Sequence, residues 1–269
     1  MITSLSNAKI KNVVNLVQKS KVRNEQDSFV VEGVKMFLEA PIELVREVYV
    51  SQTYEQSLIH SAEPEKQEIL GKLQKCGYET VSDECFQKMS DTLTPQGVLC
   101  VLKKLHYDLT NILQKTDSGS LFVFLENLQD PGNLGTIMRT SEGAGVHAVI
   151  MTKKTVDIYN PKTIRATMGS IYRVPFIYIE ETRQTIELLK ENKVRVYAAH
   201  LKGTTYYDGQ DYTGSTAFLI GNEGNGLTEE TAVMADTYIK IPMHGKLESL
   251  NAAIATSLLI YEAERQRRG

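Results

Sequence analysis

The stretch TYIKIPMHGKLESLNAAIATSLLIYEAERQRRG, Thr237–Gly269, joins a strand pattern to a helix pattern through a polar segment. The β-branched and aromatic run Thr237–Ile241 predicts a buried strand, and the apolar spacing over Leu250–Tyr261 predicts a helix. Ser249 is a candidate N-cap, which would leave the first backbone N–H groups of this helix facing the loop. Asn251 is polar where an apolar residue would pack more easily. These features indicate a binding site at the mouth of the helix.

Strand and helix patterns alternate upstream of this stretch as far as Leu121. Apolar runs predict strands at Leu121–Leu125, Ala148–Met151, Val174–Ile179, Val194–Ala199, Ala217–Ile220 and Tyr238–Ile241. Helical spacing extends over Leu134–Ala144, Pro161–Thr167, Glu181–Glu191, Glu229–Ala235 and Leu250–Arg265. Near-continuous apolar strands separated by helices predict an α/β domain, with a mostly parallel sheet and helices on both faces. Ligands bind such sheets beyond the carboxyl ends of the strands.

Two more polar loops follow predicted strands. In ENLQDPGNLGTIMR, which follows the first strand, a Pro-Gly-Asn turn precedes Gly135, and Arg139 comes four residues later on the next helix. In GNEGNGL, which follows the strand Ala217–Ile220, Glu223 is the only charged residue. Taken singly, the glycine-rich loop is explained by a tight turn, and Arg139 is explained by an ion pair on the helix surface. Three such loops at three strand ends indicate a shared site. The glycines match neither a phosphate loop nor a dinucleotide fingerprint.

The N-terminal part of the chain predicts a second, smaller α/β domain over residues 1–105. Helical spacing over Ser6–Ser20, with Ser6 as a candidate N-cap, and over Pro64–Cys76 alternates with short strand patterns such as Val45–Ser51 and Gly97–Leu102. No catalytic constellation is found there. Residues 106–120 are polar and predict a linker, so residues 121–269 form the second domain.

Composition favours a soluble cytoplasmic protein. The chain has 269 residues, a net charge of −3 and 42% hydrophobic residues. Three cysteines without CxxC or Cys/His spacing argue against a disulfide framework or a metal site. No apolar run is long enough to span a bilayer, and the N-terminus lacks the features of a secretory signal. The basic run in residues 1–23, and the arginines Arg265, Arg267 and Arg268, are a modest indication of phosphate contacts or, equally, solvated surface.

The three loops resemble the ordered motifs of the SpoU (TrmH-like) RNA 2′-O-ribose methyltransferases of the SPOUT class. The first motif, Asn-x-Gly-x-x-x-Arg after a proline turn, matches Asn133, Gly135 and Arg139. The second matches Gly221, Asn222, Glu223, Gly224, Gly226 and Leu227, and the third matches Ile241, Pro242, Met243, Gly245, Ser249, Leu250 and Asn251. The resemblance covers about Leu121–Gln266. Ala252-Ala253-Ile254 departs from the family's usual Val-Ser/Ala-Val run, which puts packing detail in doubt.

This resemblance implies S-adenosyl-L-methionine as methyl donor, held in a bent shape by a deep C-terminal trefoil knot formed by the second and third motifs. The implied cofactor-binding residues are Gly221, Asn222, Gly224, Ile241, Met243 and Leu250. The implied catalytic group is Arg139, Asn133, Glu223, Ser249 and Asn251, with no metal. A homodimer with its active site near the interface is also implied, and would suit the helix that carries Leu258, Leu259 and Tyr261. On Arg23 and the FVVEG segment, residues 1–105 resemble the ribosomal-protein-like domain that binds RNA in many of these enzymes.

The family assigns Arg139 to the ribose 2′-hydroxyl, often as a general base. A guanidinium is normally always protonated, which makes it a poor base. A charged Arg139 would instead bind the neighbouring phosphate and stabilise the developing alkoxide. Of the histidines near strand ends, His200 and His244 are candidate bases, although His244 is better explained as a spectator.

Three functions compete. An RNA 2′-O-methyltransferase ranks first, and the dedicated N-terminal domain favours ribosomal RNA over tRNA as its substrate. A non-catalytic RNA-binding protein on the same scaffold ranks second, against which the presence of Arg139, Glu223 and Asn251 argues. A nucleotide-dependent oxidoreductase ranks third, because the early glycine fingerprint is missing.

Overall fold

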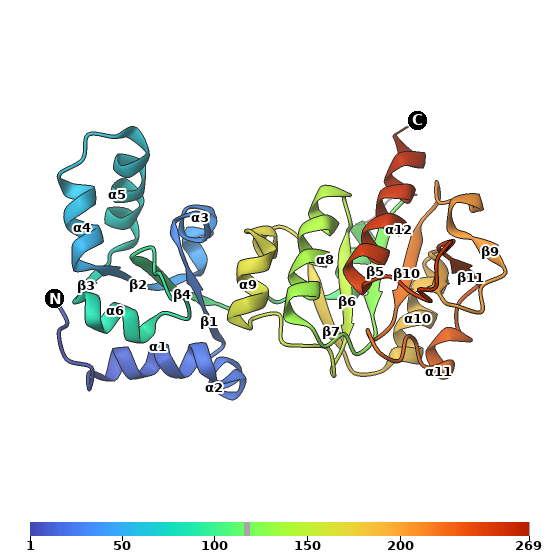
Figure 1. Ribbon diagram of the computed structural model, residues 1–269, viewed down its shortest axis with the longest axis horizontal. Coiled ribbons are helices and arrows are strands. Elements are labelled where there is room, and N and C mark those ends of the chain that lie inside the picture. The colour runs from blue at the N-terminus through green and yellow to red at the C-terminus, as the bar shows by residue number, and fades with distance from the viewer. Residues whose placement is uncertain (116–118, 269) are drawn as a thin grey trace. The chain divides into compact units, whose positions relative to one another are not determined.

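The computed structural model describes residues 1–115 and 119–268 and contains two compact units (Figure 1). One unit comprises Met1–Leu105 with Asp157–Tyr172, and the other comprises His106–Val156 with Arg173–Gly269. The short segment 157–172 thus belongs with the N-terminal unit, although the sequence pattern groups it with the C-terminal strands. Residues 116–118 of the predicted linker lie outside the described residues. The assignment of separate roles to residues 1–105 and 121–269 stays a prediction.

The N-terminal unit is built on a four-stranded mixed sheet with the strand order β1-β4-β2-β3. Its strands are β1 (Ser28–Glu32), β2 (Val45–Ser51), β3 (Glu79–Val81) and β4 (Val98–Lys103). Its helices are α1 (Ala8–Gln18), α2 (Ser20–Glu25), α3 (Val34–Glu39), α4 (Gln52–Ile59), α5 (Pro64–Cys76), α6 (Asp83–Met89) and α9 (Pro161–Thr167). The first helix begins two residues later than predicted, because the side chain of Asn7, and not of Ser6, accepts the N–H of Lys9 at 2.8 Å.

A buried ion pair fastens the segment 157–172 to the rest of this unit. The Arg23 side chain is 4% exposed and donates to the Asp157 carboxylate at 2.7 and 3.1 Å. It also donates to the carbonyl oxygen of Leu16 at 2.7 Å and that of Val17 at 3.0 Å. The role of Arg23 is therefore structural. One of the basic residues in the run 1–23 is thus not available to bind a phosphate.

The C-terminal unit contains the predicted parallel sheet, with seven strands in the order β7-β6-β5-β10-β8-β11-β9. Its strands are β5 (Leu121–Leu125), β6 (Ala148–Thr152), β7 (Phe176–Ile179), β8 (Arg195–Ala199), β9 (Thr205–Tyr206), β10 (Thr216–Ile220) and β11 (Thr237–Lys240). Every neighbouring pair is parallel. Only the two-residue strand β9 escaped prediction, because so short an edge strand has no periodicity.

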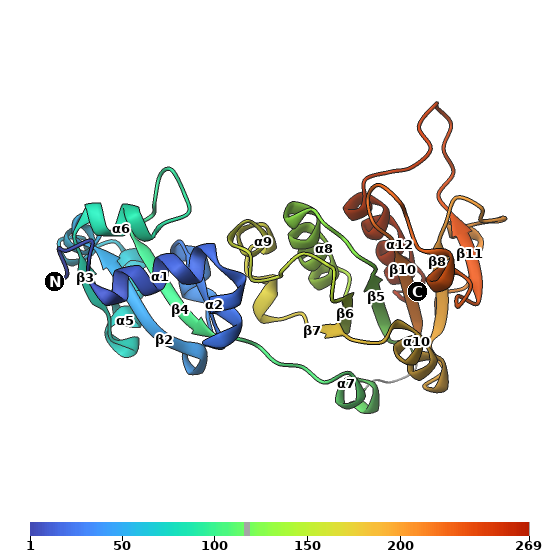
Figure 2. The same ribbon diagram turned by 90° about the horizontal axis from the view of Figure 1, so that it is seen from below.

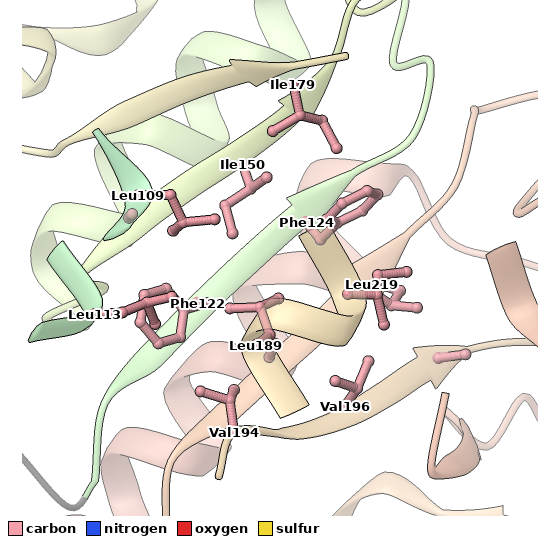
Figure 3. Packing of buried hydrophobic residues seen from close by; sticks show 14 of the residues in the cluster. Leu109, Leu113, Phe122, Phe124, Ile150, Ile179, Leu189, Val194, Val196 and Leu219 are labelled. Atoms are coloured by element: carbon pink, nitrogen blue, oxygen red, sulfur yellow. The ribbon is translucent and has the colours of Figure 1, made fainter. Parts of the chain in front are cut away.

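Helices cover both faces of this sheet, as the apolar strands predicted. They are α7 (Leu109–Lys115), α8 (Pro131–Gly143), α10 (Thr182–Glu191), α11 (Glu229–Ala232) and α12 (Ala252–Arg267). Figure 2 shows α8 and α12 on one side of the sheet and α7 and α10 on the other. Alternate residues of each strand point to opposite faces. Phe122, Phe124, Ile150 and Leu219 accordingly pack with Leu189 of α10 in one buried cluster (Figure 3).

The ends of α12 differ from the sequence prediction. The helix begins at Ala252 because the Asn251 side chain accepts the N–H groups of Ala253 and Ile254 at 2.9 and 3.3 Å. The prediction of Ser249 as its N-cap is wrong. At the other end Arg267 donates to the carbonyl oxygens of Tyr212 at 2.9 Å and Gly214 at 2.8 Å.

The other two arginines of the tail also have partners within the chain. Arg265 pairs with Glu262, and Arg268 pairs with Glu264. Together with the backbone contacts of Arg267, these pairs favour a structural role for the tail over phosphate binding. No helix within residues 1–115 and 119–268 is both long enough and apolar enough to cross a bilayer.

We predict that Leu219→Ala lowers the free energy of unfolding of the C-terminal unit by about 2–5 kcal/mol, because it opens a cavity in the buried cluster. Leu219 is fully buried on the central strand β10. Hydrogen exchange of β5 and β10 peptides during urea unfolding measures the loss in this unit alone. Val233→Ala, at a residue that is 60% exposed, serves as the control and should change stability by less than about 0.5 kcal/mol. Equal effects of the two changes would contradict the packing described.

Candidate active site

A cavity of about 310 Å³ lies beyond the carboxyl ends of β8, β10 and β11 and against the start of α12. All six residues predicted to bind the cofactor lie on its wall, namely Gly221, Asn222, Gly224, Ile241, Met243 and Leu250. Two residues of the predicted catalytic group, Glu223 and Ser249, also line it. The second and third motifs, about twenty residues apart in the chain, thus enclose one cavity, because parallel strands end at the same edge of a sheet.

The Glu223 carboxylate connects the second motif to the first. It accepts the backbone N–H of Gln129 at 3.1 Å and that of Asp130 at 3.0 Å. It also accepts the side-chain N–H of Asn133 at 3.0 Å. A carboxylate is an acceptor-only group, so three converging donors match it and hold the turn before α8 against the loop 221–227.

Asn133 and Asn251 extend this connection to the third motif. The amide of Asn251 donates to the side-chain oxygen of Asn133 at 2.9 Å, while its own oxygen caps α12. Hydrogen bonds therefore run from Glu223 through Asn133 to Asn251, and each of these three residues comes from a different motif. Neither asparagine lines the cavity, so their contribution to a site is to hold its walls together.

Burial and hydrogen bonding have opposite effects on the pKa of the Glu223 carboxyl. Partial burial alone would raise the pKa of the Glu223 carboxyl, but the hydrogen bonds from Asn133, Asp130 and Gln129 outweigh it and leave the pKa below its ordinary value. The group is therefore a carboxylate at neutral pH. A negative charge lies on the cavity wall, where it would favour a cationic ligand.

The loop 221–227 has a conformation that needs its glycines. A Cβ at Gly221 would lie 2.0 Å from the carbonyl carbon of Gly226, and Gly226 itself has φ +67°. The backbones of Asn222 and Gly226 exchange hydrogen bonds at 3.0 and 2.9 Å, which closes the loop on itself. The Asn222 side chain accepts the N–H groups of Gly224 and Asn225 and donates to the carbonyl oxygen of Asn127 at 2.8 Å.

Two residues of the predicted catalytic group have no partner within the described chain. Ser249 is exposed on the cavity wall and its hydroxyl bonds no group in residues 1–115 or 119–268. Arg139 is exposed on α8, away from the cavity wall, and among the described residues no acid or carbonyl binds its guanidinium. Six residues separate Arg139 from Asn133, a rise of about 9 Å along α8. The structure thus groups ten of the eleven predicted site residues around the cavity or its hydrogen bonds and leaves Arg139 apart.

Of the two histidines named as candidate bases, His200 directly follows β8 and lines the cavity, and its Nδ1 accepts the N–H of Lys202 at 3.1 Å. His244 does not line the cavity, and its interpretation as a spectator stays a prediction. Glu126 and Asn127, directly after β5, bind the loop 221–227 or its flank but have no local pattern that marks them. Sequence reasoning missed both residues, and the one signal that could have found them was their position directly after a predicted strand.

We predict that Glu223→Ala lowers the free energy of unfolding by about 1 kcal/mol at neutral pH, below the range of about 1.5–3 kcal/mol for charged hydrogen bonds because solvent screens this exposed group. The folded-state pKa of Glu223 is depressed, so this contribution is fully present above the ordinary carboxyl pKa and is lost as pH falls through the folded value. Thermal unfolding of both proteins from neutral to acidic pH should show their difference shrinking. Glu187→Ala, which removes an exposed ion pair of 3.9 Å on α10, should show no such convergence.

Known proteins share this architecture. The SpoU rRNA Methylase family model matches residues 120–261, and the MRM3-like substrate binding domain model matches residues 7–100. The 23S rRNA (guanosine(2553)-2′-O)-methyltransferase RlmP of Bacillus subtilis is 29% identical over 97% of this chain and 97% of its own. A putative TrmH family tRNA/rRNA methyltransferase of Staphylococcus aureus is 38% identical over 64% of this chain and 71% of its own.

A solved structure matches both units. The AdoMet-bound rRNA methyltransferase from Sinorhizobium meliloti is 30% identical and has a TM-score of 0.82, with 98% of this chain and 97% of that chain covered. The family model spans more than half of the chain and covers all three connected motifs. The chain therefore belongs to the SpoU rRNA methylase family.

Proposed function

We propose that this chain transfers the methyl group of S-adenosyl-L-methionine to a ribose 2′-hydroxyl of ribosomal RNA. The observation that carries the proposal is the hydrogen-bonded connection of Glu223, Asn133 and Asn251, which joins the first family motif to the two motifs that enclose the cavity. Ribosomal RNA is favoured over tRNA because relatives named as rRNA methyltransferases match both units of the chain. The match of residues 7–100 to a substrate-binding domain supports RNA binding by residues 1–105.

The cavity suits S-adenosylmethionine in size and chemistry. Its volume of about 310 Å³ falls at the lower end of small-molecule sites, which span roughly 300–1,000 Å³. Apolar side chains such as Leu250 and Leu259 offer surfaces for a purine, and the backbone around Gly221 and Ile241 offers polar atoms for its edge. The Glu223 carboxylate adds a negative charge for a sulfonium cation. When bound, the cofactor supplies a methyl group already activated by the positive charge on sulfur.

We assign Arg139 to the RNA. Its guanidinium is exposed and has no partner within the described chain, so it is available to a phosphate. Because a guanidinium stays protonated, Arg139 would stabilise the negative charge that develops on the 2′-oxygen as its O–CH3 bond forms and the S–CH3 bond of the cofactor breaks, while the hydroxyl proton would pass to solvent water. Ser249, with a free hydroxyl on the cavity wall, would contact the cofactor or the ribose. Asn133, Glu223 and Asn251 would keep the loops around the site in position through their hydrogen bonds to one another.

We further propose a homodimer with its interface on α12. Ile254, Leu258 and Tyr261 are 51%, 37% and 45% exposed and recur at spacings of four and three residues, which places them on one helix face. Leu259, named with Leu258 and Tyr261 from the sequence, is fully buried and is not part of this face. The same helix packs along α8, so this face would bring a second copy near Arg139. A partner surface explains an apolar stripe that a monomer would leave in water.

We also propose the trefoil knot and a cytoplasmic location. The knot is supported by the strand order, in which β10 lies between the earlier strands β5 and β8, and by the two loops that enclose one cavity. The location is supported by the three cysteines Cys76, Cys85 and Cys100, all free thiols.

We predict that deletion of this gene removes ribose methylation at one or a few rRNA positions, and that the wild-type gene restores it. Arg139→Ala should lower methyl transfer by about 100-fold or more, since it removes a charge that stabilises the transition state. The same variant should bind S-adenosylmethionine within about twofold of wild type, because Arg139 lies off the cavity wall. Methylation mapping across rRNA and tRNA, with calorimetric titration of the cofactor, tests both parts.

Arg183→Ala, at an exposed arginine of α10, is the matched control and should retain full activity. Methylation that changes at no rRNA position, or Arg139→Ala with wild-type turnover, would refute the assignment of substrate or residue respectively.

We predict that Leu258→Glu converts a dimer to a monomer, because it places a charge in the apolar stripe of α12. Sedimentation equilibrium of the full chain gives the mass directly. Val233→Glu, an equivalent change at an exposed residue of α11's end, should leave the mass unchanged. A wild-type monomer, or a Leu258→Glu dimer of unchanged stability, would rule out this interface.

A further inference from the structure

Glu126 is a buried acid that the chemistry described above does not use. It directly follows β5, it is 5% exposed, and it does not line the cavity. No arginine, lysine or histidine of the described chain pairs with it. A buried carboxylate without a cation destabilises the fold unless hydrogen-bond donors surround it, so the donors that bind Glu126 indicate its role.

Three donors converge on this carboxylate, all from the segment that follows the cofactor loop. One oxygen of Glu126 accepts the backbone N–H of Thr228 at 2.7 Å. The other accepts the hydroxyl of Thr228 at 2.8 Å and that of Thr231 in a short hydrogen bond. Thr228 is also the N-cap of α11, so Glu126 fixes the point at which the loop becomes a helix.

The next residue, Asn127, holds the other end of the same loop. Its carbonyl oxygen accepts the side chain of Asn222 at 2.8 Å. Its own backbone has φ +56°, and Thr152 bonds both its N–H, at 2.9 Å, and its side-chain oxygen, at 3.0 Å. Glu126 and Asn127 therefore hydrogen-bond residues 228 and 222, the two ends of the glycine-rich segment that forms one wall of the cavity.

We propose that Glu126 is a positioning residue that holds the loop 221–227 in the shape that binds the cofactor. A loop with three glycines loses much conformational entropy when it becomes ordered. Because hydrogen bonds at both ends of the loop already order it in the free protein, ligand binding does not have to supply that free energy. Loss of Glu126 then weakens cofactor binding and leaves the methyl-transfer step nearly unchanged once the site is filled. This inference rests on the proposed use of S-adenosylmethionine.

The test compares Glu126→Ala, Glu126→Gln and Asp236→Asn in the full-length chain. Asp236 is the matched control, because its carboxylate binds the N–H of Val196 at 2.8 Å near the start of β8, at the opposite edge of the parallel sheet from the loop. Titration calorimetry with S-adenosylmethionine gives the dissociation constant, and initial rates on the RNA substrate give kcat and KM. Hydrogen exchange of the peptide containing residues 222–228, without cofactor, reports the loop directly.

Glu126→Ala should raise the dissociation constant and the KM for S-adenosylmethionine by about tenfold, the effect of one lost charged hydrogen bond, with kcat within about threefold of wild type. It should also speed exchange in residues 222–228. Glu126→Gln should rescue most of the affinity, because its amide oxygen still accepts the N–H of Thr228 and hydroxyls can turn to accept its N–H groups. Asp236→Asn should leave the affinity unchanged even if it lowers the melting temperature.

Two results would overturn the positioning role while leaving the proposed function intact. One is wild-type cofactor affinity in Glu126→Ala. The other is equal loss of affinity in Asp236→Asn, which would reduce the effect to general stability. A wild-type chain that binds no S-adenosylmethionine would overturn the proposed function itself, and with it any cofactor role for Glu126.

Discussion

The site depends on one carboxylate that meets three donors. Glu223 extends from the glycine-rich loop after β10 to two backbone N–H groups of the turn before α8 and to one side-chain amide in the first turn of α8. Asn133, the residue with that amide, is in turn bonded by Asn251 at the start of α12. Each hydrogen bond is modest in water, but together they join segments that are 90 and 118 residues apart in the chain. The walls of the cavity are consequently parts of a single hydrogen-bonded structure.

The parallel sheet makes that meeting possible. Because all its strands run in the same direction, the loops after β5, β10 and β11 emerge at one edge. Packing on both faces keeps the strands in register, with alternate side chains facing α8 and α12 or α7 and α10. Buried carboxylates such as Glu126 then set the finer shape of the loops, because an acceptor-only group can hold several N–H and O–H donors at once.

Charged residues in this chain show why composition is a weak guide to partners. The basic run of residues 1–23 and the terminal arginines appear similar in sequence, yet Arg23 is buried against Asp157 and Arg267 binds backbone carbonyls. Arg139, a single residue in a mixed helix, keeps its guanidinium free of any partner in the described chain. Availability to a phosphate is decided by the neighbours of a cation and not by how many cations lie nearby.

The sequence alone determined the α/β class, the parallel sheet, nearly every strand and the family motifs, because periodicity and glycine spacing are local properties of the chain. The six residues predicted to bind the cofactor line one cavity, since loops at the strand ends of a parallel sheet meet at one edge, and their role in cofactor binding stays a prediction. The sequence did not determine that Asn251 and not Ser249 caps α12, that segment 157–172 belongs to the N-terminal unit, or that Glu126 and Asn127 hold the ends of the loop 221–227. Those features depend on partners distant in sequence, and only the tertiary structure brings the donors and acceptors within hydrogen-bonding distance.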